Sequence, residues 1–254
     1  MADPSTPRGT GRTLRQNVLS CLTTLSHGTA PFITTFILIH LAAPAAANLG
    51  GASFASQTML LGREYYQTDF GEKYLVLAPL ALHAVAGTAK RLLSPRKSPP
   101  RPPSSLLSLT GYSAMLLFLP IHFLTHRVYP SADAAPISNI GPSELDYEFV
   151  KLGLQKWPVT SWLLYAGLVC SVGLHMADGN AVMWNRYFRD TAVRSWAAAG
   201  KLSKRFSARA KVLVGLVLPV LSGLYFISKE PLMVFPSMVQ RFEAVFRSSW
   251  IYRL

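Results

Sequence analysis

Five long runs of apolar residues alternate with polar, charged segments along the chain. Each run approaches the length of about 17 to 25 residues that a helix needs to cross a bilayer. Aromatic side chains gather near the ends of the runs, where interfacial belts are expected: Trp157, Trp162, Trp184, Tyr187 and Tyr225. The pattern predicts five membrane-spanning helices at residues 30–48, 74–93, 107–127, 158–176 and 212–228.

The composition supports a membrane protein. Hydrophobic residues make up 50% of the chain and charged residues only 15%, against about 25% charged residues in a typical soluble domain. The charged residues behind the net charge of +13 lie outside or at the ends of the apolar runs, so they do not indicate a uniformly basic nucleic-acid-binding surface. The two cysteines, Cys21 and Cys170, form no Cys-x-x-Cys motif, which argues against a disulfide framework, a zinc site or covalent c-type haem.

The charges differ systematically between the connecting segments. Arginine and lysine dominate the N-terminal tail and the second and fourth connections, whereas the first and third connections carry several acidic residues. With five spans, the three basic segments share one side of the membrane. The excess of positive charge predicts that this side, including the N-terminus, is cytosolic.

The predicted fold is an all-α membrane protein in which two repeated helical hairpins form a four-helix bundle, joined by a fifth helix. The basic fourth connection is either a solvated loop or an amphipathic helix on anionic lipid. The predicted organisation is a cytosolic tail (1–28), a first two-span repeat (29–93), a Pro-rich basic linker (94–106), a second two-span repeat (107–184), a basic loop (185–211), the fifth span (212–228) and a C-terminal tail (229–254).

Short motifs indicate the repeat. "LHAVAG" at 82–87 and "LHMADG" at 174–179 share a His-x-x-x-Gly frame. In the preceding spans, "FILIHLAAP" at 36–44 resembles "FLPIHFLTHRVYP" at 118–130. His40 aligns with His122 through Phe-x-x-Ile-His, or with His126 through His-x-x-x-Pro. Repeated hairpins related in this way are a known membrane architecture.

Five of the six histidines lie in or at the end of the first four spans. An imidazole at membrane depth needs a partner, either a hydrogen bond to a neighbouring helix or a metal. Two imidazoles from facing helices form the usual axial pair of haem b, with the second nitrogen of each ring hydrogen-bonded. Interhelical hydrogen bonding is the alternative for each histidine. The candidate haem-binding residues are His40, His83, His122, His126, His175, Gly87 and Gly179.

The repeat predicts which histidines pair. His83 is expected to pair with His175, and His40 with the third span. His122 is the preferred partner of His40 because it lies deeper in its span, whereas His126 adjoins Arg127 at the end and stays open as an alternative. Glycine one turn after His83 and His175 leaves room for a flat macrocycle or a close helix.

The linker between the two hairpins, "SPRKSPPRPPSS" at 94–105, favours a polyproline conformation. It is either a stiff spacer or a preformed extended ligand for a partner protein. The candidate partner-binding residues are Pro99, Pro100, Arg101, Pro102 and Pro103.

Enzymatic motifs are missing from the sequence. It contains no Ser-His-Asp set, no His-Glu-x-x-His motif and no phosphate-binding loop, and the nearest carboxylate to the interior of a span is Asp178. Proton-coupled transport normally uses acidic residues within the membrane. A non-enzymatic protein is therefore expected.

Two family resemblances follow from these motifs. Five spans with a central histidine on each of four helices resemble the di-haem cytochrome b anchors of succinate:quinone and fumarate reductases. "HAVAGTAKR" at 83–91 is similar to their His-x-x-x-Gly-x-Arg-His signature, although Ala89-Lys90 stands in place of Arg-His. A Ser-x-x-His-Arg quinone-site element is missing from the first span.

The chain more closely resembles a fungal mitochondrial adaptor family whose transmembrane domain is distantly related to those anchors. The resemblance is carried by residues 56–67 ("SQTMLLGREYYQ"), 72–93 ("EKYLVLAPLALHAVAGTAKRLL"), 126–130 ("HRVYP") and 173–179 ("GLHMADG"). It implies a mitochondrial outer-membrane protein that acts in lipid homeostasis. It also implies recruitment of a bridge-like lipid-transfer protein of the vacuolar-protein-sorting class through a cytosolic Pro-x-Pro peptide, for which Pro100-Arg101-Pro102 is the candidate here.

The expected function is thus an outer-membrane adaptor with haem b in its bundle. One alternative is a di-haem cytochrome b that passes electrons from a quinol. Another is a lipid scramblase with a polar groove between the hairpins.

Overall fold

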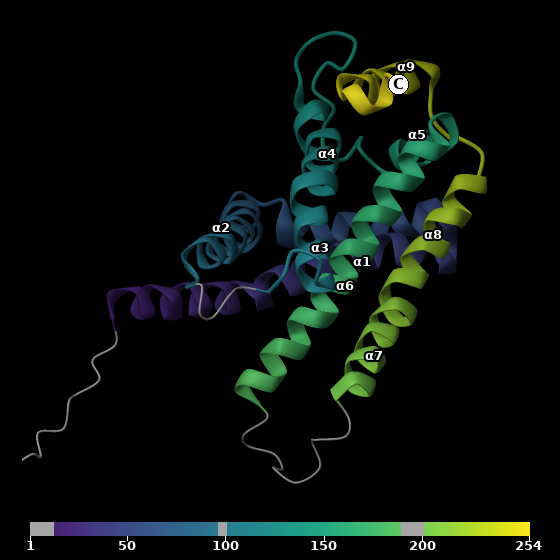
Figure 1. Ribbon diagram of the computed structural model, residues 1–254. Helices are drawn as coiled ribbons and strands as arrows, with labels where there is room; N and C mark the ends of the chain where they lie inside the picture. Colours follow the sequence, from purple (N-terminus) through teal and green to yellow (C-terminus); the bar gives the residue numbers. More distant parts are fainter. Residues whose placement is uncertain (1–12, 96–100, 189–200) are drawn as a thin grey trace, which may run out of the picture.

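The structure is a computed structural model that describes residues 13–95, 101–188 and 201–254 (Figure 1). Within these ranges all regular secondary structure is helical. Five segments are long and apolar enough to cross a membrane: Leu14–Tyr66, Gly71–Leu93, Leu106–Ser131, Pro158–Tyr187 and Ser207–Lys229. The predicted fold class and the number of spans are therefore confirmed.

The second, third and fifth spans are built from shorter helical pieces, several of them π-helical. The second span comprises η1 (Gly71–Leu77) and α2 (Ala78–Leu93). The third comprises α3 (Leu106–Tyr112), η2 (Ser113–Phe118), α4 (Leu119–Phe123), η3 (Leu124–Val128) and η4 (Tyr129–Ser131). The fourth is α6 (Pro158–Tyr187), and the fifth comprises α7 (Lys201–Val212), η6 (Leu213–Val217) and α8 (Leu218–Lys229).

The first helix, α1 (Leu14–Tyr66), is longer than predicted and folds back on itself. Thr13 forms a capping box at its start, so half of the predicted tail is helical. Its helical geometry breaks at Gly50–Gly51, where Gly51 has φ +63°. Beyond this break the second arm packs on the first, because the Tyr66 ring lies 5.6 Å from the His40 ring. The predicted first connection is therefore mainly helix.

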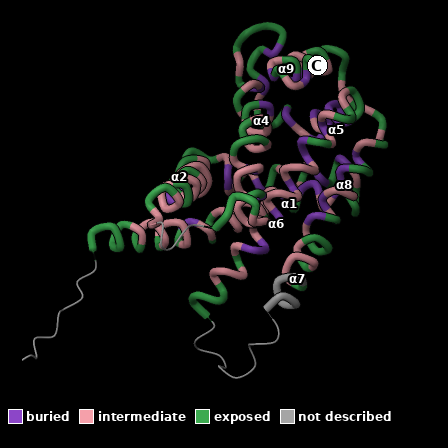
Figure 2. The backbone as a smooth tube through the Cα atoms, viewed as in Figure 1, coloured by how far each residue is buried: buried purple, intermediate pink, exposed green. Residues whose placement is uncertain are grey.

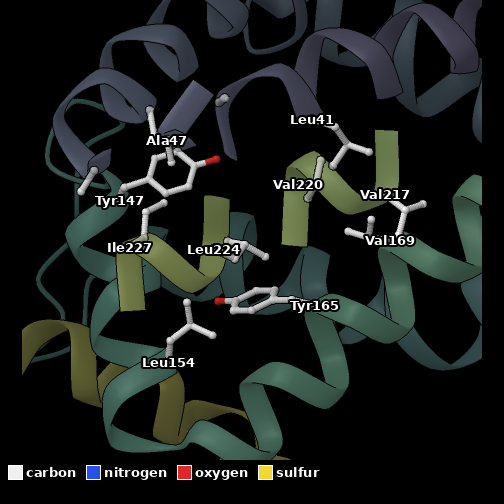
Figure 3. Close-up of a cluster of buried hydrophobic side chains, with 13 residues drawn as sticks. Leu41, Ala47, Tyr147, Leu154, Tyr165, Val169, Val217, Val220, Leu224 and Ile227 are labelled. Atoms are coloured by element: carbon white, nitrogen blue, oxygen red, sulfur yellow. The ribbon is translucent and has the colours of Figure 1, made fainter. Parts of the chain in front are cut away.

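The fifth helix completes the main core of the bundle. α1 and α2 pack together, α3 packs on α6, and α8 packs on α1. In Figure 1, α1 crosses behind α6 and α8. The side chains between these helices are aliphatic apart from the buried rings of Tyr147 and Tyr165 (Figure 3). Gly223 in α8 lies so close to the carbonyl of Pro44 that any side chain there would collide with it.

A second core lies at one end of the bundle, where α5 (Tyr147–Lys156) meets α9 (Pro236–Ser248) and η7 (Trp250–Tyr252) (Figures 1 and 2). Phe149 stacks on Phe246 with ring centroids 4.3 Å apart. Phe242 and Phe246 are fully buried. The segment predicted as a C-terminal tail, 229–254, thus contains α9 and η7, and the aromatic residues of α9 pack on α5. We call this the capped end.

The segments predicted to share one side of the membrane gather at the opposite end. Arg15 of α1 donates a hydrogen bond to the carbonyl of Leu93 at 2.8 Å, which joins the start of α1 to the end of α2. His27 Nδ1 is hydrogen-bonded to the hydroxyl of Tyr187 at 2.9 Å, which brings the end of α6 to the same place. We call this the basic end.

Candidate functional site

His83 of α2 and His175 of α6 face each other inside the bundle. Their ring centroids lie 6.1 Å apart, and the ring planes are nearly perpendicular at 85°. Both side chains are half-buried. The two residues are 92 positions apart in sequence, so the predicted His-x-x-x-Gly repeat does bring its histidines together.

Each of these rings is anchored through Nδ1. Nδ1 of His83 donates to the carbonyl of Ser26 at 2.9 Å, and Nδ1 of His175 donates to the carbonyl of Leu107 at 3.0 Å. A carbonyl can only accept, so the proton of each neutral ring sits on Nδ1 and the lone pair on Nε2. Metal-binding histidines commonly use this arrangement, because the second-nitrogen bond fixes the tautomer and the orientation of the ring.

The two anchoring bonds are equivalent in the repeat. Leu107 follows Ser26 by 81 residues, and Thr110 follows Thr29 by the same distance. Thr29 and Thr110 are both buried and bond the carbonyl four residues earlier. The repeat therefore extends beyond the motifs visible in the sequence.

The spacing of the repeat changes by one residue within the third span. His122 follows His40 by 82 residues in the Phe-x-x-Ile-His frame, rather than by 81. The π-helix η2 (Ser113–Phe118) lies between Thr110 and His122. A π-helical turn closes i→i+5 bonds and accommodates one more residue than an α-helical turn, so η2 absorbs the extra residue and keeps His122 in phase with His40.

The other three histidines form a second cluster closer to the capped end. The His40 and His122 rings lie 5.9 Å apart at 82°, and His122 stacks on His126 at 4.4 Å. His126 Nε2 is 3.2 Å from the hydroxyl of Tyr165. His40 Nδ1 is buried without a hydrogen-bond partner, and its ring stacks on Phe36. Aromatic rings thus surround this cluster, and no carbonyl anchors His40.

The first pair fits haem b better than the second cluster. The Nε2 atoms of His83 and His175 are unprotonated, and nothing lies within 4 Å of a Cβ built on Gly87 or Gly179. Gly111 of α3 packs directly on the His175 ring, where a Cβ would lie 2.7 Å from Cε1. Over the described residues, no group of three or more His, Cys, Asp or Glu side chains suits a metal ion. His83 and His175 are the residues that would hold haem iron here.

The predicted partner-binding segment lies at the basic end. Arg101, Pro102 and Pro103 are exposed, and the Pro102 carbonyl accepts a hydrogen bond from the Ser105 amide at 3.0 Å. This turn leads directly into α3. Pro99 and Pro100 lie outside the described residues, as do residues 189–200 of the predicted basic loop.

Sequence reasoning missed a polar cavity next to this turn. Asp178, identified in the sequence only as a carboxylate near the end of a span, is buried with 3% of its surface exposed. Both of its oxygens accept hydrogen bonds from Arg209 at 2.8 Å. The cavity beside them has a volume of about 380 Å³. No spacing signal links Asp178 to Arg209, which come from separate predicted segments.

The fold and the histidine-lined bundle define the protein as a multi-pass, all-helical membrane protein. Residues 117–227 match the family model of the MDM10-complementing protein 1 transmembrane domain. The matched segment includes His122, His126 and His175, together with the predicted signature segments 126–130 and 173–179. The match shows that most of the second hairpin and the fifth helix are similar to that transmembrane domain.

Comparisons with curated proteins and with solved structures give no match. The relationship to the succinate dehydrogenase cytochrome b anchors is not shown by any comparison and stays a prediction from the motifs.

Proposed function

We propose that the protein is an adaptor in the mitochondrial outer membrane, with its basic end in the cytosol, that supports lipid homeostasis by recruiting a bridge-like lipid-transfer protein of the vacuolar-protein-sorting class. The observation that carries the proposal is the family match over residues 117–227, which spans most of the second hairpin and the fifth helix.

The exposed turn at Arg101–Pro103 supports a docking role for the linker. An exposed Pro-rich segment loses little conformational entropy on binding, because each proline already fixes its own φ. The adjoining bond from Ser105 to Pro102 ties the segment to the start of α3. A partner bound here would be held next to the membrane.

The test is co-immunoprecipitation from cells that express the tagged full-length chain. The double variant Pro100→Ala/Pro102→Ala is expected to lose most of the recovered partner while the protein level stays unchanged. Pro4→Ala/Pro7→Ala is the matched control, since it removes two prolines from the tail without touching a Pro-x-Pro element. Equal recovery with both double variants would reject the linker as the docking site.

A second function, binding of haem b between His83 and His175, is favoured by a separate observation. Both rings face each other with Nδ1 tied to a backbone carbonyl, so the two Nε2 atoms are oriented as ligands. When bound there, haem b would supply one-electron redox chemistry. The role of this chain would be to orient the two imidazoles and to fix their tautomers.

The visible spectrum of the detergent-purified protein tests this second function. Protein expressed with ample haem is expected to show a sharp band after reduction with dithionite, and His83→Ala or His175→Ala should abolish it. His27→Ala is the control, because His27 bonds Tyr187 and takes no part in the pair. A featureless spectrum would leave His83 and His175 as interhelical hydrogen-bond donors.

A further inference from the structure

The polar cavity at the basic end has the properties of an anion-binding site. It lies between the start of α3, the last third of α6 and α7, and its volume is about 380 Å³. Its lining is Arg101, Ser105, Leu106, Leu107, Asp178 and Arg209. Two cations and one carboxylate therefore face the same space.

The carboxylate in the cavity is already satisfied. Asp178 is buried and accepts two hydrogen bonds from Arg209, one on each oxygen. Arg101 is left without a carboxylate partner among the described residues. The free charge in the cavity is positive, so a cationic ligand would be repelled and an anionic one attracted.

Neighbouring cations strengthen this positive field. Lys90 near the end of α2 and Arg186 near the end of α6 place further positive charge at the basic end. Neither Lys90 nor Arg186 forms an ion pair within the described part of the chain. Cations gathered at one end of the bundle without paired carboxylates attract anions to that end.

The position of the cavity identifies the class of anion. Leu106 and Arg209 in its lining lie at the starts of the third and fifth spans, Leu106–Ser131 and Ser207–Lys229. Lipid headgroups lie at the ends of spans, and basic pockets between spans commonly bind them. Leu106 and Leu107 form an apolar wall, and Leu109 on the same helix is 54% exposed. We propose that this cavity binds the phosphate group of an anionic phospholipid, with Arg101 as the principal contact and the acyl chains along α3.

Lipid titration of the full-length protein in detergent tests the proposal. Short-chain phosphatidic acid is expected to raise the unfolding temperature by binding the folded state, whereas phosphatidylcholine of the same chain length is not. Arg101→Gln should weaken phosphatidic acid binding about tenfold through loss of a charge-assisted contact. Lys211→Gln is the charge-matched control, because Lys211 is exposed and does not line the cavity.

Asp178→Asn gives a second test with the opposite sign. It removes the carboxylate that occupies Arg209, so phosphatidic acid should bind more tightly although the lipid-free protein becomes less stable. Weaker binding by this variant would contradict the proposal. Should Asp178→Asn fail to fold, the comparison of Arg101→Gln with Lys211→Gln decides alone.

Inorganic phosphate distinguishes a lipid site from a general anion site. The proposal requires that phosphate alone stabilise the protein only at much higher concentration than phosphatidic acid. An equal response to inorganic phosphate would overturn the lipid assignment. The site itself would be overturned if phosphatidylcholine raised the unfolding temperature as much as phosphatidic acid does. It would also be overturned if Arg101→Gln and Lys211→Gln bound phosphatidic acid equally well.

Discussion

The capped end and the basic end of the bundle use their charges differently. At the capped end cations meet carboxylates: Arg127 with Glu72, Lys151 with Glu148 and Glu230, Lys156 with Glu243, and Arg241 with Glu144. Among the described residues at the basic end, Asp178 and Arg209 form an ion pair. Lys90, Arg101 and Arg186 form none there. Charge at the capped end therefore holds the fold together, and charge at the basic end is available to ligands.

The difference is clearest at Lys151. Only 1% of its side chain is exposed, and its ammonium donates to Glu148 at 2.6 Å and to the Pro231 carbonyl at 3.0 Å, with Glu230 at 3.3 Å. Glu230 in turn accepts the amide of Ala52 at 3.0 Å, directly after the break in α1. One buried cation thus connects α5, the end of α8 and the hairpin of α1.

The largest expected effect is the loss of this cation. Lys151→Ala leaves Glu148 and Glu230 without their buried counter-charge, so it should lower the free energy of unfolding by about 3–5 kcal/mol. Thermal unfolding in detergent measures the change. Lys156→Ala serves as the control, since its pair with Glu243 is partly exposed and such pairs contribute less than about 1 kcal/mol. Similar unfolding temperatures for both variants would refute the structural role of Lys151.

The break in α1 should be the next most sensitive position. Gly51 has φ +63° and ψ −158°, a backbone conformation that residues other than glycine rarely adopt. A Cβ there would also collide with the Glu230 carboxylate. Gly51→Ala should destabilise the protein by about 1–3 kcal/mol. Gly28→Ala in the same helix meets nothing within 4 Å and should be neutral or stabilising. The same unfolding assay distinguishes the two, and equal effects would argue against strain at Gly51.

A smaller, pH-dependent effect is expected at Glu144. Its carboxylate accepts a hydrogen bond from the Gly141 amide and another from Arg241, and these lower its pKa below the ordinary value of 4.5. A lowered folded-state pKa contributes stability above pH 4.5, and this is lost as the pH falls through the folded-state pKa. Glu144 is partly exposed, so the contribution is below about 1 kcal/mol.

The comparison of wild type with Glu144→Gln measures this contribution. The wild-type advantage should be full near pH 6 and should shrink as the pH falls below 4.5. An advantage that stays constant across this range would mean that Glu144 acts through packing rather than charge.

The smallest effect on stability is expected at the basic end. Lys90→Gln and Arg186→Gln remove cations that have no carboxylate partner in the described structure. The free energy of unfolding of the lipid-free protein should therefore change by less than about 0.5 kcal/mol. Unfolding of delipidated protein in neutral detergent is the measurement. A clear loss of stability in either variant would make the basic end as structural as the capped end.

Much of the fold was predictable because hydrophobic length and charge are local signals. The five apolar runs and the basic connections follow from single segments of sequence. The capped end was not predictable in the same way. The aromatic residues of α9 are spaced as in any amphipathic helix, and only the fold reveals that Phe246 stacks on Phe149 of α5.

The histidine pair and Lys151 also combine features that the sequence predicts with features that only the fold reveals. His83 and His175 could be paired in advance, because a repeat in sequence implies equivalent positions in space. The partners of their Nδ1 atoms could not, since Ser26 and Leu107 contribute only backbone carbonyls, which any residue supplies. Nor could the sequence show that Lys151 is buried, as lysine is usually exposed.

The π-helix η2 has a consequence for how the two hairpins can diverge. An inserted residue in a regular helix rotates everything after it by about 100°, which would turn His122 away from His40. When the extra residue is taken up in one wide π-helical turn, the residues before and after that turn keep facing the lipid or the bundle interior as they did before. Over generations, such a turn lets one copy of a duplicated unit change in length while the contacts between the copies persist.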